Sequence, residues 1–310
     1  MNRPFDRLVH LGNVVVDVVM TVPDLPRRGG DLLARTTQVT AGGGFNVIAA
    51  AARQGLPVLY GGRHGTGPFA DVARAALAAE GVTVAASPTP EADTGVVVVM
   101  VDPGGERTFV TGPGAETTLD AADLARLGVT ARDAVHLSGY SLLHPAVADA
   151  LISWLPTLPT ETTVFFDPGP LVDQILPLDL DRVLSRVDWF TGNAREAGLL
   201  TDAETSMAAA ARLGRRTGRA GVIVRTGPAG CVLAVRGRDP LPVKGFAVAA
   251  VDSNGAGDTH TGVFISMIGA GLHPAEAARI ANAAAAISVT RTGPATCPAA
   301  AELAAFLAAG

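Results

Sequence analysis

The residues best suited to chemistry lie in one stretch, residues 251–262, where a glycine-rich turn runs directly into a helical pattern. The backbone N–H groups of Gly255, Ala256 and Gly257 can converge there, because the two glycines have no Cβ that would keep an oxyanion away. The start of the following helix adds the positive end of its dipole. Asp258 occupies the same point, where a carboxylate can accept the proton of a hydroxyl group. Amide donors beside such a base suit phosphoryl transfer from ATP to an alcohol.

A simpler interpretation is that Asp258 only caps the helix and the glycines only form a turn, since Asp is a preferred N-cap residue. The surrounding residues favour the functional interpretation. Asp252 opens the stretch, which reads D-S-N-G-A-G-D up to Asp258. This pattern resembles the second signature of the ribokinase-like (PfkB-type) carbohydrate kinases. The resemblance implies that Asp258 is the general base and that the amides of residues 255–257 form the anion hole.

The N-terminal part of the chain contains two further elements of this resemblance. Asn13 and Asp17 belong to the pattern G-N-x-x-x-D, and three glycines precede Phe45 and Asn46 at the start of an alanine-rich helical run. Taken alone, Asp17 would equally fit a side chain that faces outward from a strand, and the glycines would fit a flexible loop. The resemblance implies that five residues hold the acceptor: Asn13, Asp17, Gly42, Gly43 and Asn46.

The glycine run departs from the family pattern at two positions. Ala41 replaces the usual first glycine, and Phe45 is bulkier than the common small residue. The fold prediction is unaffected by these departures, but the identity of the acceptor stays open. Phe45 either stacks on the base of a nucleoside acceptor or fills core space.

The third element, N-x-x-E, follows an expected strand at residues 188–192. Asn193 and Glu196 have the spacing of a capping box, and the resemblance implies in addition that Glu196 orients Mg²⁺ and its waters near the ATP phosphates. A tight turn at residues 225–230 is similar to the family's phosphate-contacting turn. There Arg225 can bind phosphate oxygens bidentately. The other nucleotide-binding residues expected in these two elements are Asn193, Glu196, Gly227 and Gly230.

Asn282 lies in an alanine-rich helix expected over residues 274–290. Such a helix packs well on a sheet, and its small residues also allow a flat ring to approach. In the resembled family this helix lies beside the adenine. The resemblance also implies a site for an activating K⁺ ion, held mostly by backbone carbonyls, at Asp252, Asn254, Ser288, Arg291 and Gly293.

The order of expected elements predicts an α/β fold. From residue 119 onward helices and strands alternate, which is typical of a parallel sheet covered by helices on both faces. Four strands expected near residues 14–22, 32–39, 94–101 and 107–111 stand apart from this alternation. Together with the family resemblance, which implies that the small sheet is a lid, this order leads us to expect a ribokinase-like three-layer α/β/α sandwich with a mainly parallel central sheet and a small β-sheet lid. The whole chain, residues 1–310, is expected to form one kinase domain, with the lid strands within about 14–40 and 92–112 and a homodimer contact through the lid.

Composition excludes several other classes of protein. With 310 residues, 48% of them hydrophobic, the chain can bury a large core, and its net charge of −5 argues against a nucleic-acid polymer as partner. Lys244 is the only lysine and does not follow a glycine loop, so no Walker-type phosphate loop exists. We expect no signal peptide or membrane span. The distant Cys231 and Cys297 suggest core packing in a reducing compartment, and we expect a cytoplasmic protein.

These observations predict an ATP-dependent kinase that phosphorylates a hydroxymethyl group of a small sugar, with Mg²⁺ and K⁺ as cofactors. The alternative acceptor is a nucleoside of the adenosine or pseudouridine type. A nicotinamide-dependent dehydrogenase would share the α/β alternation, but the first strand is not followed by G-x-G-x-x-G. A non-catalytic sugar-binding protein is the remaining alternative.

Overall fold

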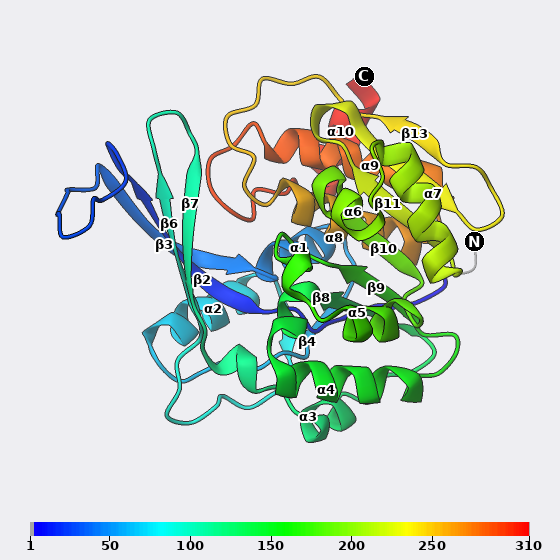
Figure 1. Cartoon of the computed structure of the whole chain (residues 1–310), viewed down its shortest axis with the longest axis horizontal. Helices are drawn as coiled ribbons and strands as arrows, with labels where there is room; N and C mark the ends of the chain where they lie inside the picture. Colours follow the sequence, from blue (N-terminus) through cyan, green and yellow to red (C-terminus); the bar gives the residue numbers. More distant parts are fainter. Residues whose placement is uncertain (1–2, 310) are drawn as a thin grey trace.

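A computed structural model describes residues 3–309. Within these residues the main sheet has nine strands (Figure 1). The seven strands from β5 at one edge to β11 are parallel to one another, and β12 and β13 at the other edge are antiparallel to their neighbours. In spatial order they are β13 (Leu241–Lys244), β12 (Gly230–Val235), β11 (Gly221–Arg225), β10 (Trp189–Asn193), β9 (Thr163–Asp167), β8 (Asp133–Ser138), β1 (Arg7–His10), β4 (Val58–Tyr60) and β5 (Thr83–Val84). The central strands are nearly continuous apolar runs, because both faces of a parallel sheet are buried.

Helices cover both faces of this sheet, and each face has its own hydrophobic core. One face packs against α1 (Phe45–Arg53), α2 (Pro68–Ala79), α8 (Ala256–Gly269), α9 (Pro274–Ser288) and α10 (Ala300–Ala309). The other packs against α3 (Ala121–Arg126), α4 (Pro145–Trp154), α5 (Pro177–Leu184), α6 (Ala194–Thr201) and α7 (Ser206–Thr217). Alternate residues of one strand enter different cores, as Leu8 and Val9 do, because successive side chains point to opposite faces. The predicted three-layer sandwich is confirmed.

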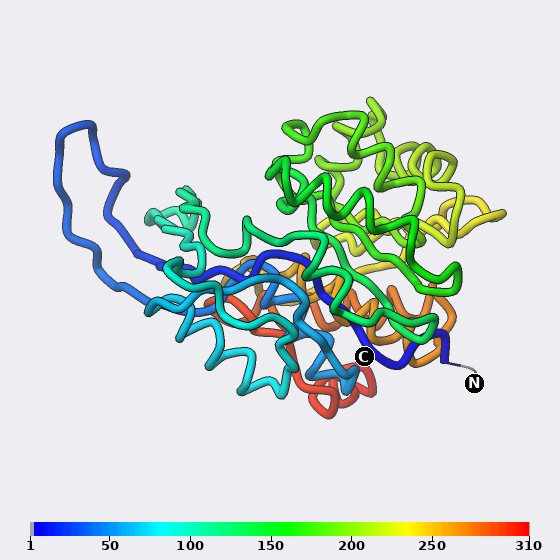
Figure 2. Tube along the Cα trace, turned by 90° about the horizontal axis from the view of Figure 1, so that it is seen from below, coloured from blue at the N-terminus to red at the C-terminus, as the bar shows by residue number. Residues whose placement is uncertain are grey.

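A second sheet of four strands extends from the body (Figure 1). Its spatial order is β3 (Thr36–Gly43), β2 (Val14–Thr21), β6 (Val96–Val101) and β7 (Arg107–Gly112). The central pair β2 and β6 is parallel, and the two outer pairs are antiparallel. The loop between β2 and β3, coloured blue, reaches furthest from the body in Figure 2. The predicted separate small sheet is thus present, and its action as a lid stays a prediction.

One strand of this sheet differs from the prediction. The strand expected at residues 32–39 runs instead over Thr36–Gly43, so that Gly42 and Gly43 end it, and helix α1 begins at Phe45. Its partner β2 sets this register, since Val14 lies opposite Gly43. Residues 31–35 lie outside the strand, and among them the Arg35 amide donates to Thr21 O of β2 at 2.7 Å. The glycine run therefore lies at the junction between the small sheet and the body.

Both cysteines are buried, in agreement with a packing role. Across residues 3–309 no helix has the length and apolarity needed to span a membrane.

Candidate active site

Two cavities lie at the carboxyl ends of the parallel strands, where sheets of this type bind ligands. The first, of about 490 Å³, lies between the two sheets and is lined by Asp17, Phe109 and Asp258 among others. The second, of about 560 Å³, lies between the turn after β11 and helices α8 and α9. Arg225 lines both cavities. The start of α8 also borders both, with Asp258 on the first and Gly257 on the second.

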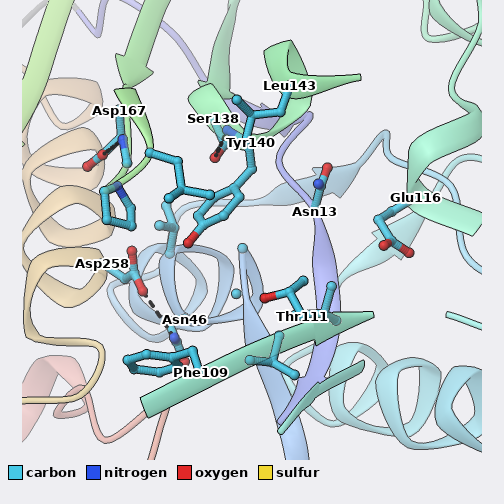
Figure 3. Close-up of a pocket in the computed structure, with 18 of the residues that line it drawn as sticks. Asn13, Asn46, Phe109, Thr111, Glu116, Ser138, Tyr140, Leu143, Asp167 and Asp258 are labelled. Atoms are coloured by element: carbon cyan, nitrogen blue, oxygen red, sulfur yellow. Dashed lines mark hydrogen bonds between the residues drawn. The ribbon is translucent and has the colours of Figure 1, made fainter. Parts of the chain in front are cut away.

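Asp258 is in the first turn of α8 but does not cap it. The N-cap is Gly255, whose φ of 69° is a left-handed conformation that favours glycine, and no side chain caps this helix. The carboxylate instead accepts a hydrogen bond from Asn46 Nδ2, with Oδ2 at 3.0 Å (Figure 3). Burial and the nearby Asp167 raise the pKa of Asp258 to about 6. The alternative that Asp258 is only a capping residue is therefore wrong.

The turn into α8 contains the three backbone amides of the predicted anion hole, those of residues 255–257. The first amides of a helix have no carbonyl partner within the helix, and Gly257 and Asp258, which carry two of these amides, line the second and the first cavity. The Ala256 amide is partly engaged, since it donates to Ser253 O at 3.3 Å within the turn. The role of residues 255–257 as an anion hole stays a prediction.

Asp17 is buried in β2 and lines the first cavity, so the alternative of an outward-facing side chain is wrong. Its carboxylate lies against Gly42: a Cβ at position 42 would be 2.2 Å from Asp17 Oδ2. Gly42 is therefore the residue that makes room for this carboxylate. Burial, and then the charge of Asp258, raise the pKa of Asp17 to about 6.

The other residues predicted to hold the acceptor differ in whether they line the cavity and in whether their side chains already have hydrogen-bond partners in the protein. Gly43 and Asn13 line the cavity, and Asn13 Oδ1 accepts from Ser141 Oγ at 3.2 Å. Asn46 uses both ends of its amide within the protein, because its Oδ1 also accepts from the Ala295 amide at 2.9 Å. Its observed contact is thus with the candidate base. Phe45 packs in the hydrophobic core, so the alternative that it stacks on a base is wrong.

Arg225, predicted as a phosphate ligand, is held by an acidic partner that the predicted set of site residues omits. Its Nη1 donates to Asp167 Oδ2 and to Thr261 Oγ1, both at 2.9 Å, and its Nη2 lies 3.8 Å from Glu196 Oε2. Burial alone would lower the pKa of Arg225, but the charges of Asp167 and Glu196 raise it. One signal for Asp167 exists in the sequence, namely its place at the end of a strand before Pro-Gly. Gly227 and Gly230, both with positive φ, shape the turn that follows.

Glu196 forms the predicted capping box with Asn193. The Asn193 amide donates to Glu196 Oε2 at 2.7 Å, and the Glu196 amide donates to Asn193 Oδ1 at 2.9 Å. The carboxylate is buried and lines the first cavity. Burial and Asp167 raise the pKa of Glu196, while Arg225 opposes this shift. Capping and a role toward a metal are compatible at this position.

The second cavity has small residues on its walls, including Gly227, Gly230, Gly245, Ala285 and Ala286. Asn282 lies on this wall, and its side chain is fully engaged. Its Nδ2 donates to Val243 O and Lys244 O at 3.0 and 3.1 Å, so its Oδ1 accepts from His260 Nε2 at 3.1 Å. Asn282 therefore shapes the cavity, and His260 is a lining residue that the sequence did not indicate.

Three of the five predicted K⁺-site residues meet in the structure. Asp252 accepts from the Asn254 amide at 2.8 Å and from the Gly293 amide at 3.0 Å. The side chain of Arg107, on β7 of the small sheet, forms an ion pair with the same carboxylate. The side chains of the two others are engaged elsewhere, since Ser288 Oγ donates to Ala285 O at 2.8 Å and Arg291 pairs with Glu302. A contribution of these two residues through their backbone carbonyls stays a prediction.

Comparison with known proteins bears directly on this arrangement. Residues 6–301 match the model of the pfkB family carbohydrate kinases. The chain belongs to the PfkB family of carbohydrate kinases. This PfkB-family kinase is 30% identical over 287 residues to the uncharacterized sugar kinase YegV of Escherichia coli, covering 91% of this chain and 88% of that protein. It is also 30% identical over 294 residues to the ribokinase of Haemophilus influenzae, covering 92% and 93% of the two chains.

A solved structure agrees with these sequence relatives. The ribokinase of Thermotoga maritima superposes with a TM-score of 0.81 at 25% identity, covering 98% of the PfkB-family kinase and all of that chain (100%). The predicted family, fold and enzyme class are confirmed. The dehydrogenase and the non-catalytic sugar-binding protein are therefore excluded as alternatives.

Proposed function

We propose that this kinase transfers the γ-phosphoryl group of ATP to a hydroxymethyl group of a small neutral sugar bound in the first cavity. The observation that carries the proposal is the position of Asp258. Its carboxylate lines the first cavity at the amide-bearing start of α8, where the preceding Gly257 lines the second, and Asn46 holds it by a hydrogen bond of 3.0 Å. The acceptor and the nucleotide then occupy separate cavities that meet at the base.

In the proposed reaction the acceptor hydroxyl loses its proton to Asp258 while its oxygen attacks the γ-phosphorus. The bond from the γ-phosphorus to the bridging oxygen breaks, and that electron pair leaves with ADP. The amides of residues 255–257 and the guanidinium of Arg225 stabilise the negative charge on the transferring group. With a pKa of about 6, Asp258 is ionised at pH 7 and is more basic than an ordinary Asp.

A Mg²⁺ ion at this site would have few ligands from the protein itself. In residues 3–309 no group of three His, Cys, Asp or Glu side chains is arranged to hold a metal ion. Mg²⁺ commonly binds through one or two carboxylates, waters and substrate phosphates, and the buried Glu196 carboxylate on the cavity wall can supply such a contact. The ion would neutralise phosphate charge and orient the γ-phosphoryl group.

The charges that line the first cavity support a neutral acceptor. Asp17, Glu116, Asp167, Glu196 and Asp258 line it, and Arg225 is the only Lys or Arg among its described lining residues. A sugar that already carries a phosphate or carboxylate would meet like charges. A free hydroxyl-bearing sugar meets carboxylates that can accept its hydrogen bonds.

The alternative acceptor is a nucleoside phosphorylated on its ribose. The observation in its favour is that two aromatic residues, Phe109 and Tyr140, line the first cavity (Figure 3). Aromatic faces can stack on a base. A neutral nucleoside satisfies the charge argument equally well.

We propose that the small sheet is a lid that closes over the acceptor, and that it also forms the contact of a homodimer. Phe109 of β7 lines the cavity and is 55% exposed, and Val39 and Val110 are exposed on the same sheet. A sheet with exposed apolar residues needs a cover. Closure would exclude water, which competes with the sugar hydroxyl for the phosphoryl group.

The function is tested by incubating the purified enzyme with ATP, Mg²⁺ and a panel of D-ribose, D-fructose, adenosine, pseudouridine and phosphates of these compounds that leave a hydroxymethyl group free, namely the sugar 1-phosphates and the nucleoside 3′-phosphates. We expect ADP release that depends on one of the neutral compounds and is absent with its phosphate. Phosphorylation of a phosphorylated member alone would contradict the neutral acceptor. Turnover of none of the neutral compounds would contradict the proposed acceptor class.

A further inference from the structure

Two histidines form a stacked pair at the carboxyl end of the main sheet. His10 of β1 and His136 of β8 lie opposite each other in the parallel register, so both rings project from the same face. Their ring centroids are 4.9 Å apart with planes 16° from parallel, and their Nδ1 atoms are 3.2 Å apart. That separation is the length of a hydrogen bond between the two rings.

This contact determines what the pair offers to a ligand. A hydrogen bond between two Nδ1 atoms requires that one ring carries its proton on Nδ1 and that the other has none there. In a neutral pair the first ring then has a bare Nε2, and the second has an Nε2–H. Whichever ring is the donor, the pair therefore presents one hydrogen-bond donor and one acceptor at its two Nε2 atoms.

Neither Nε2 is satisfied within the protein. Both atoms are buried and have no hydrogen-bond partner among the described residues, although His10 and His136 both line the first cavity. A Cβ would lie 2.7 Å from His10 Nε2 at position 12 and 2.4 Å from it at position 44. Gly12 and Gly44 thus leave the room that this nitrogen needs. Buried polar groups are rarely left unpaired without a functional reason.

The pair is neutral at physiological pH. Burial, and then the neighbouring His136, hold the pKa of His10 well below its ordinary value. Burial lowers the pKa of His136 to about 4, with Arg225 adding to this shift and Asp167 opposing it. A neutral pair cannot balance the charge of a phosphate or carboxylate. It matches a group that is itself neutral and can both donate and accept.

We propose that the His10–His136 pair recognises a hydroxyl group of the acceptor, other than the one that is phosphorylated, through one of its two Nε2 atoms. The proposal rests on the proposed function, because it needs a neutral hydroxyl-bearing acceptor in the first cavity. The pair then acts as a specificity-determining element: it favours acceptors with a hydroxyl at this wall over those with hydrogen there.

Leucine variants separate this role from a structural one. His10→Leu/His136→Leu replaces both partners with apolar side chains, which leaves no half-satisfied ring behind. His136→Gln keeps an amide near the position of Nε2. The matched control is His64→Leu, since His64 is equally buried but hydrogen bonds to Ala86 O at 3.1 Å and does not line the cavity.

The probes are whichever of D-ribose, D-fructose, adenosine and pseudouridine the wild type phosphorylates, together with its monodeoxy analogues. We expect the double variant to raise the KM of the parent acceptor by roughly 5- to 100-fold with kcat little changed. One monodeoxy analogue should show the same penalty in the wild type and none in the variant. His136→Gln should raise the KM of the parent acceptor less than the double leucine variant does, and His64→Leu should leave this KM unchanged.

A second measurement uses the folded wild type alone. With ¹⁵N-labelled histidine, the Nε2 signals of His10 and His136 should shift when the parent acceptor binds and stay in place with the decisive deoxy analogue. Unchanged KM values in the leucine variant, or unchanged Nε2 signals, would overturn this inference while the proposed function stands. A wild type that phosphorylates none of the four probes would overturn the proposed function, and this inference with it.

Discussion

The two cavities of this kinase differ most in the charge of their walls. The first is lined by five carboxylates and contains the candidate base, whereas the second is lined mainly by glycine, alanine and other uncharged residues. Arg225 and the start of α8 are the features they share. In the proposed reaction the ionisable groups are thus concentrated where a proton and a phosphoryl group move, and we propose that the second cavity selects the nucleotide by shape.

This difference also explains how the buried carboxylates are tolerated. Ionised carboxylates away from water are costly unless they are paired or hydrogen-bonded. Arg225 pairs with Asp167 and lies close to Glu196, and Asn46 bonds to Asp258. Three of the five carboxylates, Asp167, Glu196 and Asp258, are thus compensated by one cation and one amide, and Glu116 accepts from the Gly95 and Gly114 amides.

Arg225→Met should have the largest effect, because it changes both cavities at once. Removing the guanidinium leaves Asp167 and Glu196 without their cation, so we expect the free energy of unfolding to fall by about 3 kcal/mol. Loss of one charge-stabilising donor should also lower kcat by about 10²–10³-fold. Urea unfolding and steady-state rates measure the two effects. Arg225→Lys is the control, and an unaffected Arg225→Met enzyme would contradict a shared role.

Ala285→Leu should affect only the second cavity. The larger side chain fills space between α9 and the glycine turn, so we expect the KM for ATP to rise by roughly tenfold or more while the acceptor KM stays the same. Ala283→Leu is not a suitable control because that residue is in the core. Ala301→Leu is a suitable control, because Ala301 is exposed on α10. An increase in the acceptor KM alone would show that the two cavities are wrongly assigned.

The pH dependence should belong to the acidic cavity alone. Because the pKa of Asp258 is raised to about 6, its protonated form, which cannot accept a proton, predominates below pH 6. We expect kcat to fall about tenfold per pH unit below that value and to be level above pH 7. Measurements at saturating ATP and acceptor test this. A kcat that is constant from pH 7.5 to 5 would contradict a base with this pKa.

The smallest effect should come from monovalent cations. Arg107 already pairs with Asp252, so a K⁺ ion at this carboxylate would add little charge compensation. We expect weak activation in potassium over tetramethylammonium salts at matched ionic strength, and a larger ratio in Arg107→Met. Equal rates in both salts for both enzymes would remove the proposed K⁺ site.

The sequence predicted the residues that local patterns determine. Asp258 follows a glycine turn, and Glu196 has the spacing of a capping box, so the local pattern alone assigns each of them to the first turn of a helix. A local pattern could not predict the orientation of the Asp17 side chain, because a strand residue can face either side of its sheet. The resemblance favoured an orientation toward the cavity, and the contact of the Asp17 carboxylate with Gly42 shows this orientation in the structure.

What the sequence could not show are contacts between distant strands. Arg225 and Asp167 are 58 residues apart, and His10 and His136 are 126 residues apart. These pairs depend on which strands are neighbours and in what register, which no local pattern contains. The strand expected at 32–39 was displaced for the same reason, since its pairing with β2 sets where it begins.

The most direct test of the central claim is to compare Asp258→Asn with the wild type for both chemistry and nucleotide binding. The amide can still accept the hydrogen bond of Asn46 but cannot take up a hydroxyl proton. We predict that kcat falls by about 10²–10⁴-fold, while the Kd for ATP, measured by calorimetry, stays within a few-fold of the wild-type value. A variant that keeps more than about half of the wild-type kcat would contradict the assignment of Asp258 as the general base.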